Sequence, residues 1–363
     1  MSPAASDWMI YGANGYTGEL VAEEAVARGM RPILAGRRAE VLAPIAARLG
    51  LEHRVFELSS GEEVARQLGG PTAGVRALLL CAGPFSRTSA PAVDGCLAAG
   101  VHYLDITGEI GVFEACHARG DEAARAGCVV LPGVGFDVVP SDCLAASLAA
   151  ALPGATELAL AFHGAASPSK GTAKTMLEGI PHGGAIRRDG VITEVPLGWK
   201  TAEIPFHDST RLAVTIPWGD VSTAYYSTHI PNIEVYMAQP PKMIRAMKMA
   251  RPFRRVLGLG AVQRFAARRI DARVQGPDAA MRASARSELW GRVRDGSGRE
   301  VEGTLTTPEG YRLTVLSSLA SVERLLAGGV APGAHTPSTA FGADFVAEIE
   351  GCTLRVPAAR RAA

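Results

Sequence analysis

Three glycines near the start of the chain have the spacing of a phosphate-binding turn. Gly12, Gly15 and Gly18 follow a short apolar run and precede a segment with helical periodicity over 19–28. In such a strand, turn and helix, the first glycine permits the tight turn, the second lets the backbone approach a pyrophosphate, and the third lets helix and strand pack closely. The pattern predicts a nucleotide-binding site, although glycine turns also occur in proteins that bind nothing.

The end of the second expected strand bears on the choice of cofactor. NAD sites usually carry Asp or Glu about 20 residues past the glycine motif, where the carboxylate binds the ribose 2′-hydroxyl. Here the chain has Gly36, Arg37 and Arg38. A guanidinium matches a phosphate that a carboxylate would repel, so NADPH is favoured over NADH. The alternative is that both arginines are solvated residues at the start of a helix.

The elements that must position these residues alternate regularly. After the first strand, strands are expected over 31–35, 53–58, 75–81, 101–104 and 128–131, with helices over 39–49, 89–99 and 112–126. Such alternation implies right-handed crossovers and a parallel sheet covered on both faces. We therefore predict an α/β fold, with a doubly wound parallel Rossmann sheet in residues 1–140.

The remaining chain is less regular and predicts a second, α+β domain over 141–330, for substrate binding and dimerisation. Strands are expected over 157–162, 211–216, 223–238, 283–294 and 300–307, and helices over 311–327 and 336–350. The turn at 295–298 makes the last two strands a hairpin in a mixed or antiparallel sheet with helices on one face. Residues 331–363 are expected to form a helix and tail packing back on the first domain. Substrate is expected in the cleft between the domains.

Composition narrows the class of protein. The chain has 363 residues, of which 47% are hydrophobic, which is enough for two cores. Its formal net charge of +1 gives no field that would attract nucleic acid. The six cysteines are scattered, with neither a CxxC nor histidines at metal-ligand spacing, so we expect free thiols, no metal and a cytoplasmic location.

Five ordered motifs together resemble the saccharopine dehydrogenase-like oxidoreductases. They lie at 12–18, 34–38, 81–85, 100–109 and 133–142, and the resemblance continues through 223–236 and 336–345. The chain is most similar to the bacterial branch that includes the trans-acting enoyl reductases of lipid and polyketide assembly. His229 departs from that branch, where glycine is expected before Ile-Pro-Asn.

The resemblance implies an NADPH-dependent oxidoreductase that reduces an activated C=C bond, enoyl or enone, of an apolar lipid- or polyketide-type substrate by hydride transfer. One alternative is another NADP-linked enzyme, either an imine or ketone reductase or a saccharopine-type amine dehydrogenase. Another is a non-catalytic NADPH-binding interaction protein.

The predicted cofactor contacts come from the glycine turn, the two arginines and the ends of three further strands. The segment 81–85 ends the fourth strand at the carboxyl edge, where its small residues let the chain pass close to the nicotinamide ribose; the alternative is a plain turn. Leu58, beside Glu57, lies near the expected adenine pocket; the alternative is a core leucine beside an exposed acid. The predicted residues are Gly12, Asn14, Gly15, Tyr16, Thr17, Gly18, Arg37, Arg38, Leu58, Cys81, Ala82, Gly83, Pro84, Phe85 and Asp105.

Four further residues are candidate catalytic groups. Lys170 lies in a polar segment, 167–174, that enters a helix and suits an oxyanion or carbonyl; the alternative is a helix cap with solvated lysines. Tyr225 and His229 share a face of one expected strand and could donate a proton together; the alternative is two half-buried strand residues. Asp137 follows the sixth strand and could orient cofactor or substrate; the alternative is a cap, with Asp142, for the next helix.

One segment predicts a partner. Residues 242–269 contain nine cations and no acid, interleaved with large apolar residues, which fits a basic amphipathic helix interrupted near Pro252 and at 258–260. Such a patch suits an acidic carrier protein that delivers a carrier-bound substrate, or an anionic membrane that holds the protein at its periphery. The alternative is a solvated arginine face.

Overall fold

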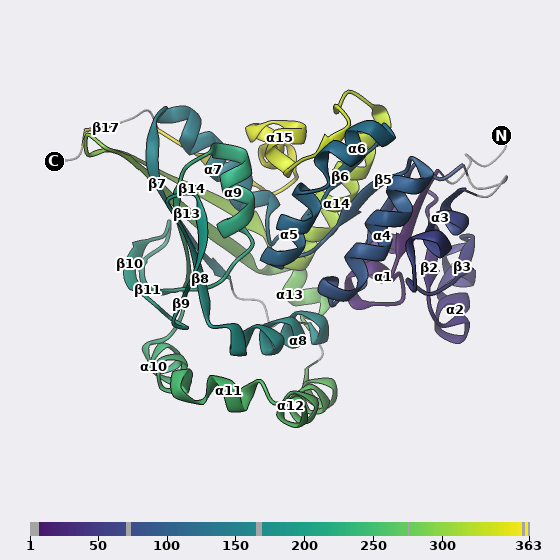
Figure 1. Cartoon of the computed structure of the whole chain (residues 1–363), viewed down its shortest axis with the longest axis horizontal. Helices are drawn as coiled ribbons and strands as arrows, with labels where there is room; N and C mark the ends of the chain where they lie inside the picture. Colours follow the sequence, from purple (N-terminus) through teal and green to yellow (C-terminus); the bar gives the residue numbers. More distant parts are fainter. Residues whose placement is uncertain (1–6, 70–73, 165–168, 275, 358–359, 362–363) are drawn as a thin grey trace. The chain divides into compact units, whose positions relative to one another are not determined.

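The computed structural model describes residues 7–69, 74–164, 169–274, 276–357 and 360–361 (Figure 1). The chain divides into two compact units, the first formed by Met1–Val139 and Leu313–Gly342, the second by Pro140–Arg312 and Ala343–Ala363. The first division lies close to the expected 140. The later boundaries differ from those expected at 330 and 331. Residues 313–330 belong to the first unit, and the residues after 342 belong to the second.

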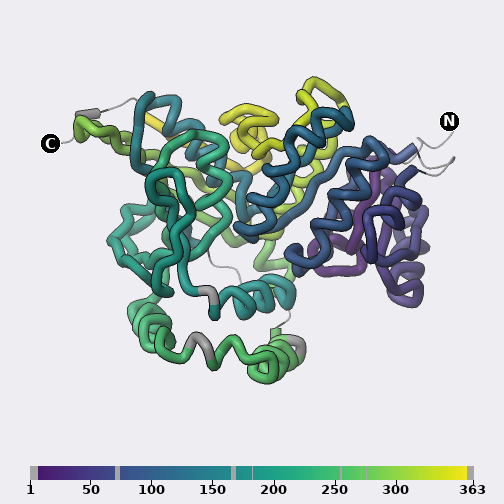
Figure 2. Tube along the Cα trace, viewed as in Figure 1, coloured from purple at the N-terminus to yellow at the C-terminus, as the bar shows by residue number. Residues whose placement is uncertain are grey.

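The first unit contains a seven-stranded parallel sheet in the order β15-β6-β5-β4-β1-β2-β3. Its strands are β1 (Trp8–Tyr11), β2 (Ile33–Gly36), β3 (His53–Val55), β4 (Ala77–Leu80), β5 (His102–Asp105), β6 (Val129–Leu131) and β15 (Gly333–Ala334). The order of the first six strands is that of the Rossmann fold, with the reversal at β1. The predicted doubly wound sheet is confirmed, and β15, from late in the chain, pairs with β6 as a seventh strand. The course of the chain can be followed by its colour in Figure 2.

Helices connect these strands. They are α1 (Tyr16–Ala27), α2 (Ala39–Leu49), α3 (Gly61–Gly69), α4 (Phe85–Ala99), α5 (Ile110–His117), α6 (Gly120–Ala126), α14 (Gly310–Ala327) and α15 (Pro337–Phe341). The single helix expected over 112–126 is two helices, and α3 was not expected.

Alternation along β1 explains why both faces of the sheet are covered. Trp8 and Ile10 lie in one buried cluster, and Met9 and Tyr11 in another on the opposite face. Leu319 of α14 belongs to the cluster of Trp8 and Ile10. Burial of the apolar side of α14 against this cluster stabilises the first unit by the hydrophobic effect. This explains why α14, although late in the chain, belongs to the first unit.

The second unit contains a ten-stranded sheet. Its strands are β7 (Ala155–Gly164), β8 (Gly184–Arg188), β9 (Val191–Val195), β10 (Thr201–Pro205), β11 (Thr210–Thr215), β12 (Asn232–Ala238), β13 (Arg286–Asp295), β14 (Arg299–Pro308), β16 (Thr353–Arg355) and β17 (Arg360–Arg361). The path β10-β11-β12-β7-β13-β14-β16 is antiparallel except between β12 and β7. The mixed sheet and the β13–β14 hairpin are as predicted, and Asp295 holds the turn by accepting the N–H groups of Ser297 and Arg299.

The helical segments of the second unit are α7 (Val139–Ala151), α8 (Lys170–Gly179), η1 (Ile180–His182), α9 (Asp220–Thr228), α10 (Pro241–Ala250), η2 (Arg251–Phe253), α11 (Arg254–Leu257), α12 (Gly260–Arg273), α13 (Ala279–Ser284) and η3 (Ala343–Glu348). The interrupted helix predicted over 242–269 is confirmed as α10 to α12. The described part of the chain has no helix with the length and hydropathy needed to span a bilayer.

Two sequence predictions are wrong here. The strand expected over 223–238 is the end of α9 followed by β12, because His229 takes a left-handed conformation (φ 57°) and Pro231 prevents the helix from continuing. The helix expected over 336–350 divides at Gly342 (φ 94°) into α15 and η3.

Candidate functional site

The turn between β1 and α1 has the geometry that its glycines predict. Gly12 has a φ of 86°, and its N–H donates to the carbonyl oxygen of Ala35 at 2.8 Å. A Cβ at Gly12 would lie 2.8 Å from the backbone nitrogen of Ala82, and one at Gly18 would overlap the Gly12 carbonyl oxygen. Both glycines are therefore required by the fold itself.

Gly15 differs from its two neighbours, because a side chain there would meet little protein. A Cβ at Gly15 would lie 3.2 Å from the Gly12 carbonyl oxygen and near no other heavy atom beyond its chain neighbours within 4 Å. Gly15 is also the N-cap of α1, which has no side-chain cap hydrogen bond. The first turn of α1 therefore has the glycine geometry of an anion-binding helix N-terminus, as a pyrophosphate site requires.

The two arginines after β2 lie at the surface. Arg37 directly follows the last residue of β2, and Arg38 is the N-cap of α2. Both side chains are exposed, and neither takes part in a hydrogen bond or ion pair within the described ranges. Asn14 lies beside this strand end, since a Cβ at Gly36 would be 3.0 Å from its Oδ1. The arrangement suits a phosphate on the ribose of a bound dinucleotide.

The segment after β4 is held by side chains from elsewhere in the unit. The Glu109 carboxylate accepts the N–H groups of Phe85 and Ser86, each at 2.9 Å, and so caps α4. The Thr88 hydroxyl donates to the carbonyl oxygen of Ala82 at 2.6 Å. Burial raises the pKa of Cys81 to about 12, so its thiol stays protonated. Glu109 and Thr88 thus position the predicted cofactor segment 81–85.

Asp105 joins the ends of β5 and β6. Its carboxylate accepts hydrogen bonds from the hydroxyl of Tyr103 at 2.6 Å and from the N–H groups of Thr107 at 3.0 Å and Gly133 at 2.8 Å. The side chain is fully buried, and burial raises its pKa to about 6. Its observed role is to hold this edge of the sheet together, and its contact with a cofactor stays a prediction.

Asp137 lies against the same edge, between β6 and α7. A Cβ at Gly108 would come 2.6 Å from its Oδ2, so the backbone after β5 packs directly on the carboxyl group. Burial raises the pKa of Asp137 to about 7. A carboxyl group with a pKa near neutral can serve as a general acid, a role different from the orienting one predicted from the sequence.

The predicted adenine-side residue Leu58 does not end a strand, because β3 stops at Val55. Its side chain is half-buried and packs against the core cluster that contains Tyr11. The hydroxyl of Tyr11 donates to the carbonyl oxygen of Phe56 at 2.8 Å, which fixes the chain just before Leu58. A contact of Leu58 with adenine stays a prediction.

Tyr225 and His229 lie together, although on a helix and its C-cap rather than on a strand. Their ring centroids are 6.3 Å apart, as residues one helical turn apart allow. The buried Arg187 guanidinium lies 4.3 Å over the Tyr225 ring and donates to the carbonyl oxygens of Val221 and Gly190. Tyr225 and His229, the pair predicted as proton donors, are therefore adjacent, and the Arg187 guanidinium is held over the Tyr225 ring.

The N-terminus of α8 is closed by the protein's own groups. Ser169 is its N-cap and accepts the N–H of Thr172 at 3.3 Å, while the Ser169 N–H donates to the hydroxyl of Tyr311 at 2.5 Å. Lys170 is exposed, and the described residues show no contact between it and Tyr225 or His229. Ser167, which belongs to the predicted motif, lies outside the described residues. The observed geometry is that of a helix cap. The part played by Tyr311, 142 positions from Ser169, could not be predicted from the sequence.

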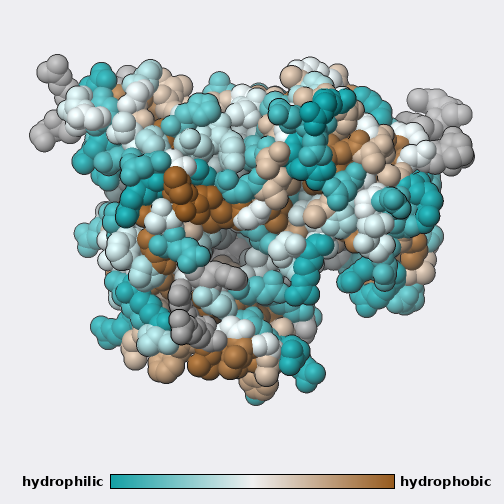
Figure 3. All heavy atoms as spheres, viewed as in Figure 1, coloured by the Kyte–Doolittle hydropathy of each residue, from teal (hydrophilic) through white to brown (hydrophobic). Residues whose placement is uncertain are grey.

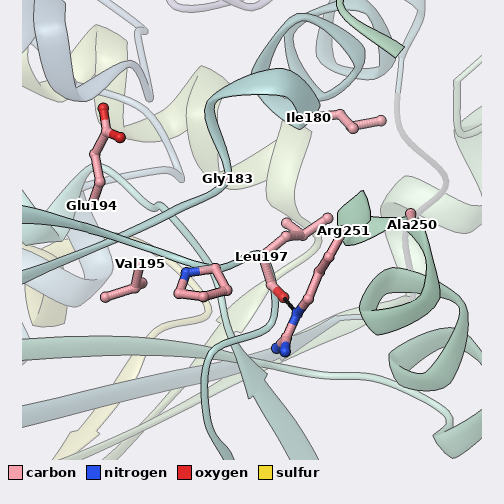
Figure 4. A pocket seen from close by; sticks show the side chains of 8 residues that line it. Ile180, Gly183, Glu194, Val195, Leu197, Ala250 and Arg251 are labelled. Carbon is pink, nitrogen blue, oxygen red and sulfur yellow. Dashed lines mark hydrogen bonds between the residues drawn. The ribbon is translucent and has the colours of Figure 1, made fainter. Parts of the chain in front are cut away.

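The second unit also has a cavity of about 340 Å³ that no motif indicated (Figure 4). It is lined by Ile180, Gly183, Glu194, Val195, Pro196, Leu197, Ala250 and Arg251. Arg251 donates to the carbonyl oxygens of Leu197 and Gly198, each at 2.7 Å, and so forms one wall. Three separate chain segments build this cavity, so periodicity along the sequence could not reveal it.

Comparison with known proteins supports the resemblance stated from the motifs. No protein-family model matches the chain. The trans-acting enoyl reductase of Mycobacterium bovis is 34% identical over 151 residues, which are 39% of this chain and 35% of the relative. That of Mycobacterium leprae is 33% identical over 141 residues, 38% of this chain and 34% of the relative. The match thus spans about a third of the length of these relatives.

Among solved structures, saccharopine dehydrogenase (L-Glu forming) of Saccharomyces cerevisiae superposes with a TM-score of 0.64 at 11% identity. The superposition covers 97% of this chain and 99% of that one, so the fold is that of a saccharopine dehydrogenase. The predicted similarity to the saccharopine dehydrogenase-like oxidoreductases, and to the trans-acting enoyl reductases among them, is confirmed.

Proposed function

We propose that this protein is an NADPH-dependent oxidoreductase that reduces an activated C=C bond of an apolar, lipid- or polyketide-type substrate. The observation that carries the proposal is the turn at Gly15, the N-cap of α1, which offers no capping side chain and where an added Cβ would meet only the Gly12 carbonyl oxygen, at 3.2 Å. The exposed Arg37 and Arg38 at the end of β2 support NADPH over NADH. The nature of the reduced bond is supported by the similarity to trans-acting enoyl reductases.

The residues of the first unit would hold the cofactor. The first-turn amides of Thr17 and Gly18 would bind the pyrophosphate, and the two arginines would bind the 2′-phosphate. The segment 81–85, fixed by Glu109, would lie along the nicotinamide ribose. When bound, a reduced nicotinamide supplies a hydride to an electrophilic carbon.

The remaining requirement is a proton for the carbon next to the one that receives the hydride. Asp137, whose pKa burial raises to about 7, can exchange a proton near neutral pH beside the backbone of Gly108. The adjacent Tyr225 and His229 are the second candidate pair for this step. Lys170 carries a positive charge that could polarise the carbonyl oxygen of an enoyl group.

The test is product formation with deuterium-labelled NADPH. Incubated with a 2-enoyl thioester, the protein should oxidise NADPH in equal amount and give a saturated thioester carrying one deuterium, which mass spectrometry detects. Matched ketone and imine substrates should give no oxidation. Oxidation with a ketone or imine alone would reassign the reduced bond. NADPH binding without oxidation of any of the three substrates would identify a non-catalytic binding protein.

A further inference from the structure

The segment from α10 to α12 exposes an unusual density of large apolar side chains. Those exposed by about half or more are Met243, Met249, Phe253, Val256, Leu259 and Phe265. Met249 is 68% exposed and Phe265 61%. Over α11, at the lower edge of the view, Figure 3 shows hydrophobic residues beside hydrophilic ones. A soluble surface rarely gathers so many exposed apolar groups without a partner.

These side chains are presented by an anchored segment. Ile244 of α10 is buried, with 4% of its surface exposed. Arg251 is fixed to the carbonyl oxygens of Leu197 and Gly198. The Gln263 side-chain amide of α12 donates to the carbonyl oxygen of Leu177 in α8 at 3.2 Å. Ile244, Arg251 and Gln263 thus attach the segment to the rest of the unit, and the exposed apolar side chains belong to other positions of the same segment.

The same segment carries mostly positive charge, and the one acid within its bounds is Asp271, near the end of α12. Lys242, Arg245, Lys248, Arg264, Arg268 and Arg269 are exposed, and no Asp or Glu occurs from 242 to 270. Within the described ranges no ion pair engages any of these six side chains. The whole chain has a net charge of only +1, so this is a local concentration of charge.

We propose that the α10–α12 segment binds an anionic lipid surface, with its apolar side chains in the interfacial region and its cations against the headgroups. Cations alternating with Phe, Leu and Met along short helices are the composition of interfacial helices. A second copy of the chain would bring like charges together, which opposes pairing through this face. An acidic protein would match the cations, but it would leave six large apolar side chains without a matching role.

Vesicle flotation tests the proposal without cofactor or substrate, so its result does not depend on the proposed function. The full chain should float with vesicles of phosphatidylcholine and phosphatidylglycerol in equal amounts, and much less with pure phosphatidylcholine. Raising the salt concentration should weaken binding, because exposed charges are screened.

Two variants separate charge from apolar burial. Arg245→Glu with Arg268→Glu should weaken binding about 25-fold or more, since each cation near an anionic membrane contributes about fivefold. Phe253→Ser with Leu259→Ser should weaken it about tenfold or more through lost apolar burial. Their matched controls, Arg188→Glu with Arg355→Glu and Val55→Ser with Val191→Ser, change exposed residues outside the segment and should bind like the unmodified chain.

Three outcomes would overturn the proposal. The first is no flotation with the anionic vesicles. The second is equal binding by the segment variants and their controls. The third is that the chain does not bind vesicles but associates with a second copy or with an acidic acyl carrier protein, and that the segment variants abolish this association.

Discussion

Two helices, α1 and α4, begin at the same edge of the parallel sheet, after neighbouring strands. Their N-termini differ in the groups that the protein offers to the first-turn N–H groups. The N-cap of α1 is Gly15, which has no side chain to offer, whereas at α4 the carboxylate of Glu109 accepts the N–H groups of Phe85 and Ser86. Each N-terminus carries the partial positive charge that favours an anion. At α4 the protein's own Glu109 is the anion, whereas at α1 we expect the anion to come from a bound ligand. We propose that a dinucleotide phosphate binds at the N-terminus of α1.

The largest effect is expected where the uncapped N-terminus is blocked. Gly15→Val should weaken NADPH binding about 100-fold or more, because its branched side chain fills the place of the pyrophosphate. Valine adopts the extended conformation of Gly15 (φ −86°, ψ 162°) readily, so the fold should persist if the Gly12 carbonyl oxygen, 3.2 Å from the added Cβ, shifts by a few tenths of an ångström. Titration calorimetry measures the loss, and circular dichroism checks the fold.

Gly111→Val is the matched control for this variant. Gly111 lies in the first turn of α5, and a Cβ there would meet nothing within 4 Å. NADPH binding should be unchanged. Undiminished binding by Gly15→Val would place the nucleotide elsewhere.

A smaller effect, on stability, is expected at the capped N-terminus. Glu109→Ala removes the acceptor of two backbone N–H groups and should lower the free energy of unfolding by about 1–3 kcal/mol. Urea denaturation measures this change. Asp121→Ala, at an exposed site on α6, should change stability by less than about 0.5 kcal/mol. If both variants were equally stable, the carboxylate would not be the cap that stabilises α4.

The sequence predicted the first unit well and the second only in part, for a physical reason. Strands such as β1 and β4 are buried on both faces, so their apolar runs and the glycine turn are visible locally. The end of α9 was mistaken for a strand because Tyr225 and Tyr226 favour strands, while packing of the helix decided otherwise. Glu109, Tyr311 and the cavity beside Arg251 depend on distant segments meeting, which no local pattern encodes.

A further effect concerns pH and two carboxyl groups, those of the buried Asp105 and the half-buried Asp137. Burial raises the pKa of Asp105 to about 6 and that of Asp137 to about 7, both above the ordinary 3.8. The folded chain therefore keeps protons that the unfolded chain releases, so this contribution to stability is complete below about pH 4 and is lost as the pH rises to about 7.

Urea midpoints measured from pH 5 to pH 8 should show this loss, of about 1 kcal/mol or more. Asp137→Asn cannot release a proton, so its midpoint should vary less between pH 6 and pH 8. A variant whose midpoint falls as steeply as that of the unmodified chain would show that Asp137 is ionised throughout this range.

The central claim is that the uncapped turn and the two arginines after β2 form an NADPH site. Titration of NADPH and NADH against the unmodified chain and against Arg37→Ala with Arg38→Ala tests it most directly, with Arg125→Ala as an exposed control in the same unit. The unmodified chain should prefer NADPH. The double variant should lose about 1–3 kcal/mol of NADPH binding per charge-assisted contact and bind NADH almost unchanged. Equal loss for both cofactors, or a preference of the unmodified chain for NADH, would contradict the account.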